Sequence, residues 1–117
     1  MDENFYNETF DIFNSAWGEE SQYRICIEEM SELTKELCKY IRYSKNLPSE
    51  ENDKKLAKIK EKIIEETADV LICASQIKRL IGDKEVEKMM EYKIKRGRKK
   101  VDDYIENLNK GGNNGQQ

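Results

Sequence analysis

Apolar residues recur at steps of three and four along almost the whole chain, and Pro48 is the only proline. This spacing gathers apolar side chains on one face of a helix, whereas a strand requires a two-residue alternation. Gly18 and Gly82 are strong breaks before the glycine-rich end of the chain. The sequence therefore predicts an all-α fold, a four-helix bundle with short connections.

The predicted helices cover about 8–17, 20–43, 54–81 and 84–108, with a polar loop between the second and third. Gly82 is expected to end the third helix and Asp83 to cap the fourth. The expected apolar stripes are Cys26, Met30, Leu33, Leu37, Tyr40 and Ile41, then Ile59, Ile63, Val70, Cys73, Ile77 and Leu80. We expect one domain over residues 1–109 and a disordered polar tail over 110–117.

Charge excludes several classes of protein. The chain has 21 basic and 24 acidic residues, a net charge of −3, which argues against a dedicated nucleic-acid binder. The basic run Lys93–Lys100 is interpreted as a face shared between phosphate contacts and solvent. No apolar run approaches the roughly 18 residues that a membrane helix needs.

Histidine is absent, which removes histidine-dependent triads and the usual zinc ligand sets. Three cysteines without CxxC spacing indicate reduced core thiols in a cytoplasmic protein. Carboxylates therefore remain as the candidate catalytic groups. Carboxylates that bind hard cations such as Mg²⁺ are typical of sites for phosphate substrates.

Acidic residues interrupt the apolar stripes on two helices. Glu66 follows the stripe of the third helix and Asp69 adjoins it, while Glu29 and Glu32 form a similar pair on the second. An unpaired carboxylate in a dry interior costs at least several kcal/mol, so the four acids need cations. Mg²⁺ is the better candidate, and lysines from neighbouring helices remain an alternative. The other acids of these two helices are expected on solvated faces, namely Glu28, Glu36, Glu61 and Glu65.

Several motifs follow one another in a recognisable order. EExxE covers Glu28–Glu32, ExxD covers Glu66–Asp69, CKYxR covers Cys38–Arg42 and EYKxxR covers Glu91–Arg96. Over about residues 10–100 the chain resembles the MazG-like all-α nucleoside triphosphate pyrophosphohydrolases. The gap between EExxE and ExxD is longer than in the tightest family patterns, and the extra length falls in the polar loop and helix start.

The resemblance implies hydrolysis of a nucleoside triphosphate to the monophosphate and pyrophosphate, in nucleotide-pool housecleaning. It implies Mg²⁺, for which Mn²⁺ can substitute, held by Glu29, Glu32, Glu66 and Asp69, and a bundle completed as a homodimer or homotetramer. A phosphoribosyl-ATP pyrophosphohydrolase and a non-catalytic helical interaction module remain alternatives. Base and sugar preference stay open.

Supporting residues each have two interpretations. Glu28 is either the proton acceptor or a surface acid. Gln22 either hydrogen-bonds a base or sugar or is an ordinary residue of the first helical turn, and Trp17 either stacks on a base or anchors the core or an interface. The pairs that are candidates for phosphate contact are Lys39 with Arg42 and Lys93 with Arg96.

Overall fold

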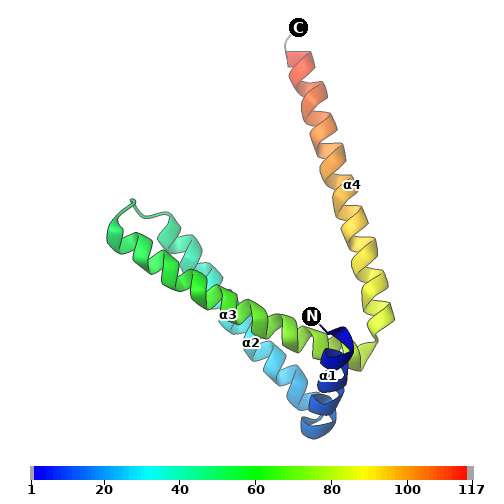
Figure 1. Cartoon of the computed structure of the whole chain (residues 1–117). Helices are drawn as coiled ribbons and strands as arrows, with labels where there is room; N and C mark the ends of the chain where they lie inside the picture. Colours follow the sequence, from blue (N-terminus) through cyan, green and yellow to red (C-terminus); the bar gives the residue numbers. More distant parts are fainter. Residues whose placement is uncertain (1, 116–117) are drawn as a thin grey trace. The chain divides into compact units, whose positions relative to one another are not determined.

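The fold of the chain is all-α. A computed structural model describes residues 2–115, with side chains as far as residue 111. In this described part there are four helices and no strand: α1 (Glu3–Trp17), α2 (Glu19–Ser44), α3 (Glu50–Ile81) and α4 (Asp83–Gly115) (Figure 1). None of the described helices is both long and apolar enough to cross a membrane. The predicted fold class is therefore confirmed.

The chain divides into two compact units, one ending at Ile81 and the other beginning at Gly82. The first unit holds α1, α2 and α3, and the second is the helix α4. Within the first unit, α2 and α3 form a long antiparallel hairpin, and α1 packs on the end of it that contains the start of α2 and the finish of α3 (Figure 1). The single bundle of four helices and the single domain over 1–109 stay predictions.

Glycine at position 18 is required by the backbone. It alone separates α1 from α2, and its φ of 84° lies in the region that side chains disfavour. Its N–H donates to the Asn14 carbonyl at 3.0 Å, and its carbonyl accepts from the Gln22 N–H at 3.2 Å. One residue thus ends one helix and begins the next, as the sequence predicts.

The third helix begins four residues earlier than the periodicity predicts. The Ser49 hydroxyl accepts from the Asn52 N–H at 3.0 Å, which is N-cap geometry. The Asn52 side chain is buried and donates to the Tyr43 carbonyl at 3.1 Å, which ties the connection to the end of α2. Polar capping residues therefore start α3, before the apolar stripe becomes visible in the sequence.

The fourth helix differs from its prediction at both ends. Gly82, with φ 144°, supplies the carbonyl that accepts from the Val86 N–H at 3.1 Å, so Asp83 is the first helical residue rather than the cap. The helix continues through Gly97 and over residues 110–115, where the composition predicts a disordered tail. Residues 116 and 117 lie outside the described part. Ion pairs one turn apart along α4, such as Lys95–Glu91 at 2.8 Å, support a long solvated helix.

The core of the first unit is small and unusually polar. Among the described residues, the buried apolar side chains are Cys26, Ile59 and Cys73. The buried polar ones are Gln22, Glu36, Asn52 and Gln76. Glu36, expected on a solvated face, is only 7% exposed and pairs with Lys39 at 3.4 Å. Its position seven residues after Glu29 explains this, because both lie on the inward face of α2.

The predicted stripe of α2 combines two faces of the helix. Cys26 is buried and Leu33 and Tyr40 are half-buried, but Met30, Leu37 and Ile41 are 47%, 44% and 56% exposed. The stripe predicted for α3 is buried or half-buried throughout. A second apolar face of α2 therefore remains uncovered within the first unit.

Candidate metal centre

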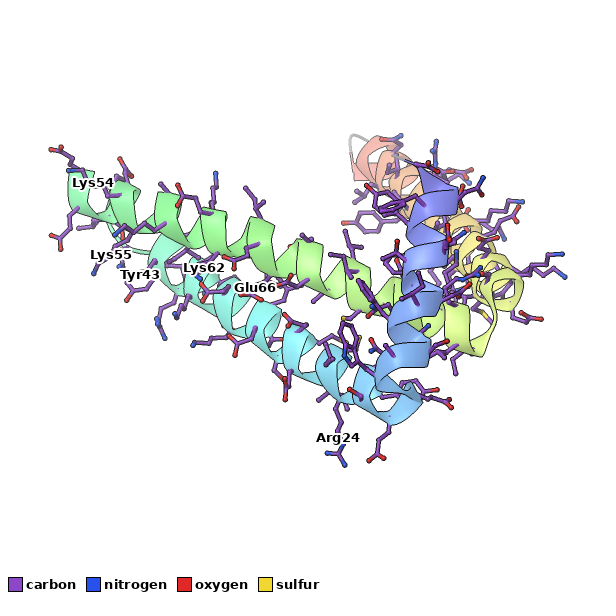
Figure 2. The ribbon with its side chains drawn as sticks, turned by 60° about the horizontal axis from the view of Figure 1, so that its bottom comes forward. Arg24, Tyr43, Lys54, Lys55, Lys62 and Glu66 are labelled. Carbon is purple, nitrogen blue, oxygen red and sulfur yellow. The ribbon has the colours of Figure 1, made fainter. Side chains whose placement is uncertain are left out.

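The hairpin brings together three of the four predicted metal ligands. Glu29 comes from α2, and Glu66 and Asp69 come from adjacent turns of α3. One carboxylate oxygen from each lies within 4.8 Å of the others, and all three side chains are half-buried. Figure 2 labels Glu66 on the side of α3 that faces α2. The i, i+3 spacing on α3 and the antiparallel packing of α2 produce this cluster.

The electrostatics of the cluster are unfavourable without a cation. The pKa of Glu29 is raised, first by loss of hydration and then by the negative charges of Asp69 and Glu66. Every contribution to this shift acts against the ionised form. The acids therefore repel one another, and a cation between them would relieve that repulsion.

The spacing of the cluster fits one hard cation. Mg²⁺ binds oxygen at about 2.0–2.1 Å, so two ligands on opposite sides of the ion are about 4.2 Å apart. The observed limit of 4.8 Å between carboxylate oxygens is close to that value. Small side-chain movements would bring all three acids onto a single ion and leave other coordination positions for water or phosphate.

The other two acids of EExxE lie outside the cluster. Glu28 and Glu32 are both exposed, and neither belongs to the group of described acids that converge. Glu32 is three residues beyond Glu29, so it is rotated further toward solvent on α2. The structure thus assembles Glu29, Glu66 and Asp69, and leaves Glu32 at the rim of the hairpin.

A cavity of about 180 Å³ adjoins the cluster. Two of the three acids, Glu29 and Asp69, are part of its wall. The other lining residues come from all three helices of the unit and are Phe13, Trp17, Gln22, Ile25, Ile72, Cys73 and Gln76. The wall therefore combines aromatic and aliphatic side chains with a few amides and carboxylates, and small-molecule pockets have this kind of lining.

Aromatic and amide groups occupy defined places in this wall. The rings of Phe13 and Trp17 stack with centroids 5.1 Å apart, and Trp17 remains 59% exposed. Gln22 is 1% exposed, yet its amide nitrogen has no hydrogen-bond partner among the described residues. A buried amide without a partner is costly, so a ligand atom in the cavity would satisfy a real deficit.

Sequence reasoning missed Gln76, which is 5% exposed and lines the same cavity. Its backbone carbonyl accepts from the Asn14 side chain at 3.3 Å, which links α1 to α3. A signal for it existed, because Gln76 lies seven residues after Asp69 and Gln22 lies seven before Glu29. Each glutamine is thus two turns from an acid on the same helix face.

The predicted phosphate contacts of α2, Lys39 and Arg42, lie further along the helix than the cluster. Lys39 pairs with Glu36 at 3.4 Å and lies ten residues beyond Glu29, about 15 Å along α2. Arg42 is further along and lies over the Tyr43 ring at 5.2 Å. Lys93 and Arg96 are exposed on α4, in the second unit.

The cysteines differ from one another in their surroundings. Cys38 is exposed, so the expectation of three core thiols is wrong for this residue. Cys26 and Cys73 are buried, and the Cys73 thiol lies 3.0 Å from the Cys26 sulfur. Burial, followed by the contact with Cys26, raises the pKa of Cys73 to about 12.

Comparison of the chain with protein-family models, with curated proteins and with solved structures finds no match. The resemblance to the MazG-like enzymes therefore rests on the sequence motifs alone.

Proposed function

We propose that the chain is a Mg²⁺-dependent pyrophosphohydrolase that converts a nucleoside triphosphate to the monophosphate and pyrophosphate. The observation that carries the proposal is the convergence of Glu29, Glu66 and Asp69 beside a cavity with aromatic and amide walls. Metal ions held by such carboxylate clusters typically act on substrates that are themselves negatively charged, such as phosphates. The motif order of the sequence supports the same activity.

The acids of the site have different proposed roles according to their positions. Glu29, Glu66 and Asp69 would hold the metal, with Mn²⁺ as a substitute, and a bound ion would neutralise phosphate charge and make water more acidic. The exposed acids Glu28 and Glu32 flank the cluster on α2, where either can orient or deprotonate the attacking water. Water attacks the α-phosphorus, and pyrophosphate leaves.

The cavity is proposed as the base site. Trp17 and Phe13 offer stacking faces, and the unsatisfied Gln22 amide offers a hydrogen bond to the edge of a base. A volume of about 180 Å³ lies below the roughly 300–1,000 Å³ of typical ligand pockets, so the cavity holds the base while the sugar and phosphates lie outside it. The basic residues Lys39, Arg42, Lys93 and Arg96 remain candidates for the phosphate chain.

A second copy of the chain is proposed to cover the uncovered apolar side of the hairpin. Ile27, Met30, Leu37 and Ile41 on α2 and Ile64 and Leu71 on α3 are between 44% and 72% exposed. Helical phase places both rows on the same side of the hairpin, away from the cavity. Two hairpins packed through these rows would form a four-helix bundle, as a dimer or as half of a tetramer.

The decisive experiment incubates the purified protein with each NTP and dNTP, and with phosphoribosyl-ATP, in the presence of Mg²⁺. Release of pyrophosphate and the matching monophosphate is expected for at least one nucleoside triphosphate. Glu66→Gln should lose turnover, whereas Glu61→Gln, the same change at an exposed position on the same helix, should retain it. No consumption of any triphosphate, or full activity of Glu66→Gln, would refute the proposal.

The principal alternative is a non-catalytic helical interaction module, which the exposed apolar side of the hairpin would also suit. The two proposals differ in their response to ligands. When a non-hydrolysable triphosphate is added, an enzyme of the proposed kind should show a further rise in melting temperature in Mg²⁺ and no rise in EDTA, and an interaction module should show no rise in either. Turnover of phosphoribosyl-ATP alone would assign the related histidine-synthesis activity instead.

A further inference from the structure

Two buried thiols face each other directly beside the candidate metal centre. Cys26 lies one turn before Glu29 on α2, and Cys73 lies one turn after Asp69 on α3. Their sulfur atoms are 3.0 Å apart, and the two side chains are 3% and 2% exposed. A disulfide bond measures about 2.05 Å, so bonding requires an approach of only about 1 Å.

We propose that Cys26 and Cys73 form a reversible disulfide that joins α2 to α3 at the floor of the site and switches the site off. The oxidant is a small peroxide. Cys73 lines the cavity of about 180 Å³ beside Glu29 and Asp69, so a hydrogen peroxide molecule in the cavity would lie against this residue. Cys26 is not part of that wall and contacts Cys73 from the hairpin interior.

The chemistry balances in two steps. The Cys73 thiol loses its proton, its sulfur attacks one peroxide oxygen and the O–O bond breaks, which gives a sulfenic acid on Cys73 and one water that carries the proton. Because burial raises the pKa of this thiol to about 12, the step is slow at neutral pH and faster at alkaline pH. The Cys26 sulfur then attacks the Cys73 sulfur, the S–O bond breaks, the S–S bond forms and a second water leaves. Two thiols are oxidised, one peroxide is reduced, and a dithiol reagent reverses the change.

The consequence for the site follows from the position of the bond. The disulfide draws together the two turns that carry Glu29 and Asp69, and it moves a sulfur atom out of the cavity wall. A displacement of about 1 Å in a catalytic site can cost about a hundredfold in rate. This part rests on the proposed pyrophosphohydrolase activity, while the formation of the bond does not.

The test uses the full chain with Cys38→Ser, so that only the buried pair remains. After prolonged peroxide treatment at alkaline pH, unfolding and alkylation, we expect a mass lower by about 2 Da, no alkylation, and linked tryptic peptides 25–35 and 63–78. The melting temperature should rise by about 15–30 °C, because the bond closes a loop of residues that are 47 positions apart. Cys26→Ser, in the same background, should show neither change.

Turnover is measured on the same samples. Oxidation should lower it at least tenfold, and dithiothreitol should restore it. Two alkylatable thiols after oxidation would overturn the disulfide, and unchanged turnover of the disulfide form would overturn the switch. If the reduced protein hydrolyses no triphosphate, the proposed function fails, and the masses and melting temperatures still decide the disulfide.

Discussion

The substitution Glu66→Gln should stabilise the metal-free protein while it abolishes the response to Mg²⁺. A carboxylate oxygen of Glu66 lies within 4.8 Å of one from Glu29 and one from Asp69. Glutamine keeps the shape of the side chain, removes its charge and replaces one acceptor oxygen by an NH₂ group that can donate to a neighbouring carboxylate. The change therefore isolates the repulsion within the cluster from its packing.

The size of the effect follows from the geometry. Two unit charges 4.8 Å apart repel by about 3.5 kcal/mol at an effective dielectric constant of about 20 and by about 0.9 kcal/mol in bulk water. The three acids are half-buried, so the appropriate value lies between these limits. We expect a gain of about 1–2 kcal/mol, which corresponds to a rise of about 5–10 °C in the melting temperature of a unit of this size.

The assay is thermal unfolding followed by circular dichroism, in EDTA and in Mg²⁺. In EDTA, the melting temperature of Glu66→Gln should lie above that of the wild type. The control Glu61→Gln, at an exposed position, should have the melting temperature of the wild type. In Mg²⁺, the melting temperature of the wild type should rise and that of Glu66→Gln should not. Raising the salt concentration in EDTA should reduce the difference in melting temperature between Glu66→Gln and the wild type, because salt screens the repulsion between the carboxylates.

The pH dependence has a definite sign. The pKa of Glu29 is raised in the folded state by lost hydration and by the nearby acids. The folded protein therefore holds a proton that the unfolded chain releases, and this contribution to stability is lost as pH rises through the folded pKa. The advantage of Glu66→Gln should grow over the same pH range. A metal-free Glu66→Gln protein that melts below the wild type at neutral pH would show that the acids do not repel.

Asp11→Asn should lower the melting temperature at neutral pH, because the Asp11–Arg79 pair at 2.6 Å joins α1 to α3. The pKa of Asp11 is lowered by its hydrogen bond to Arg79, so the difference from wild type should vanish as pH falls through that pKa in acid melts. Lys39→Met leaves the buried Glu36 carboxylate without its partner and should cost about 1–2 kcal/mol in urea unfolding; an unchanged midpoint would refute this. Leu71→Lys should convert the proposed homo-oligomer to monomers in light scattering without loss of helicity, and an unchanged molar mass would refute the proposed interface.

The sequence by itself determined that the chain is helical and which residues of its helices are the candidate acids. Steps of three and four with one proline are sufficient for an all-α prediction, because helix periodicity is a local property of the chain. Gly18 was identifiable for the same reason, since a positive φ between two helices requires glycine. Glu29, Glu66 and Asp69 were visible as charges within apolar stripes, and this pattern needed no knowledge of packing.

Only the tertiary structure decided which face of each helix turns inward. Sequence periodicity fixes the direction of a helix face only loosely, so the inward face of α2 was misjudged. Met30, Leu37 and Ile41 were expected in the core and are exposed, while Glu36 was expected on the surface and is buried. The same rotation of α2 leaves Glu32 out of the cluster. Contacts between helices, such as Cys26 with Cys73, join residues 47 positions apart, and no local pattern fixes that pairing. The sequence identified the four candidate acids, but the packing of α2 on α3 determines which three of them lie close together.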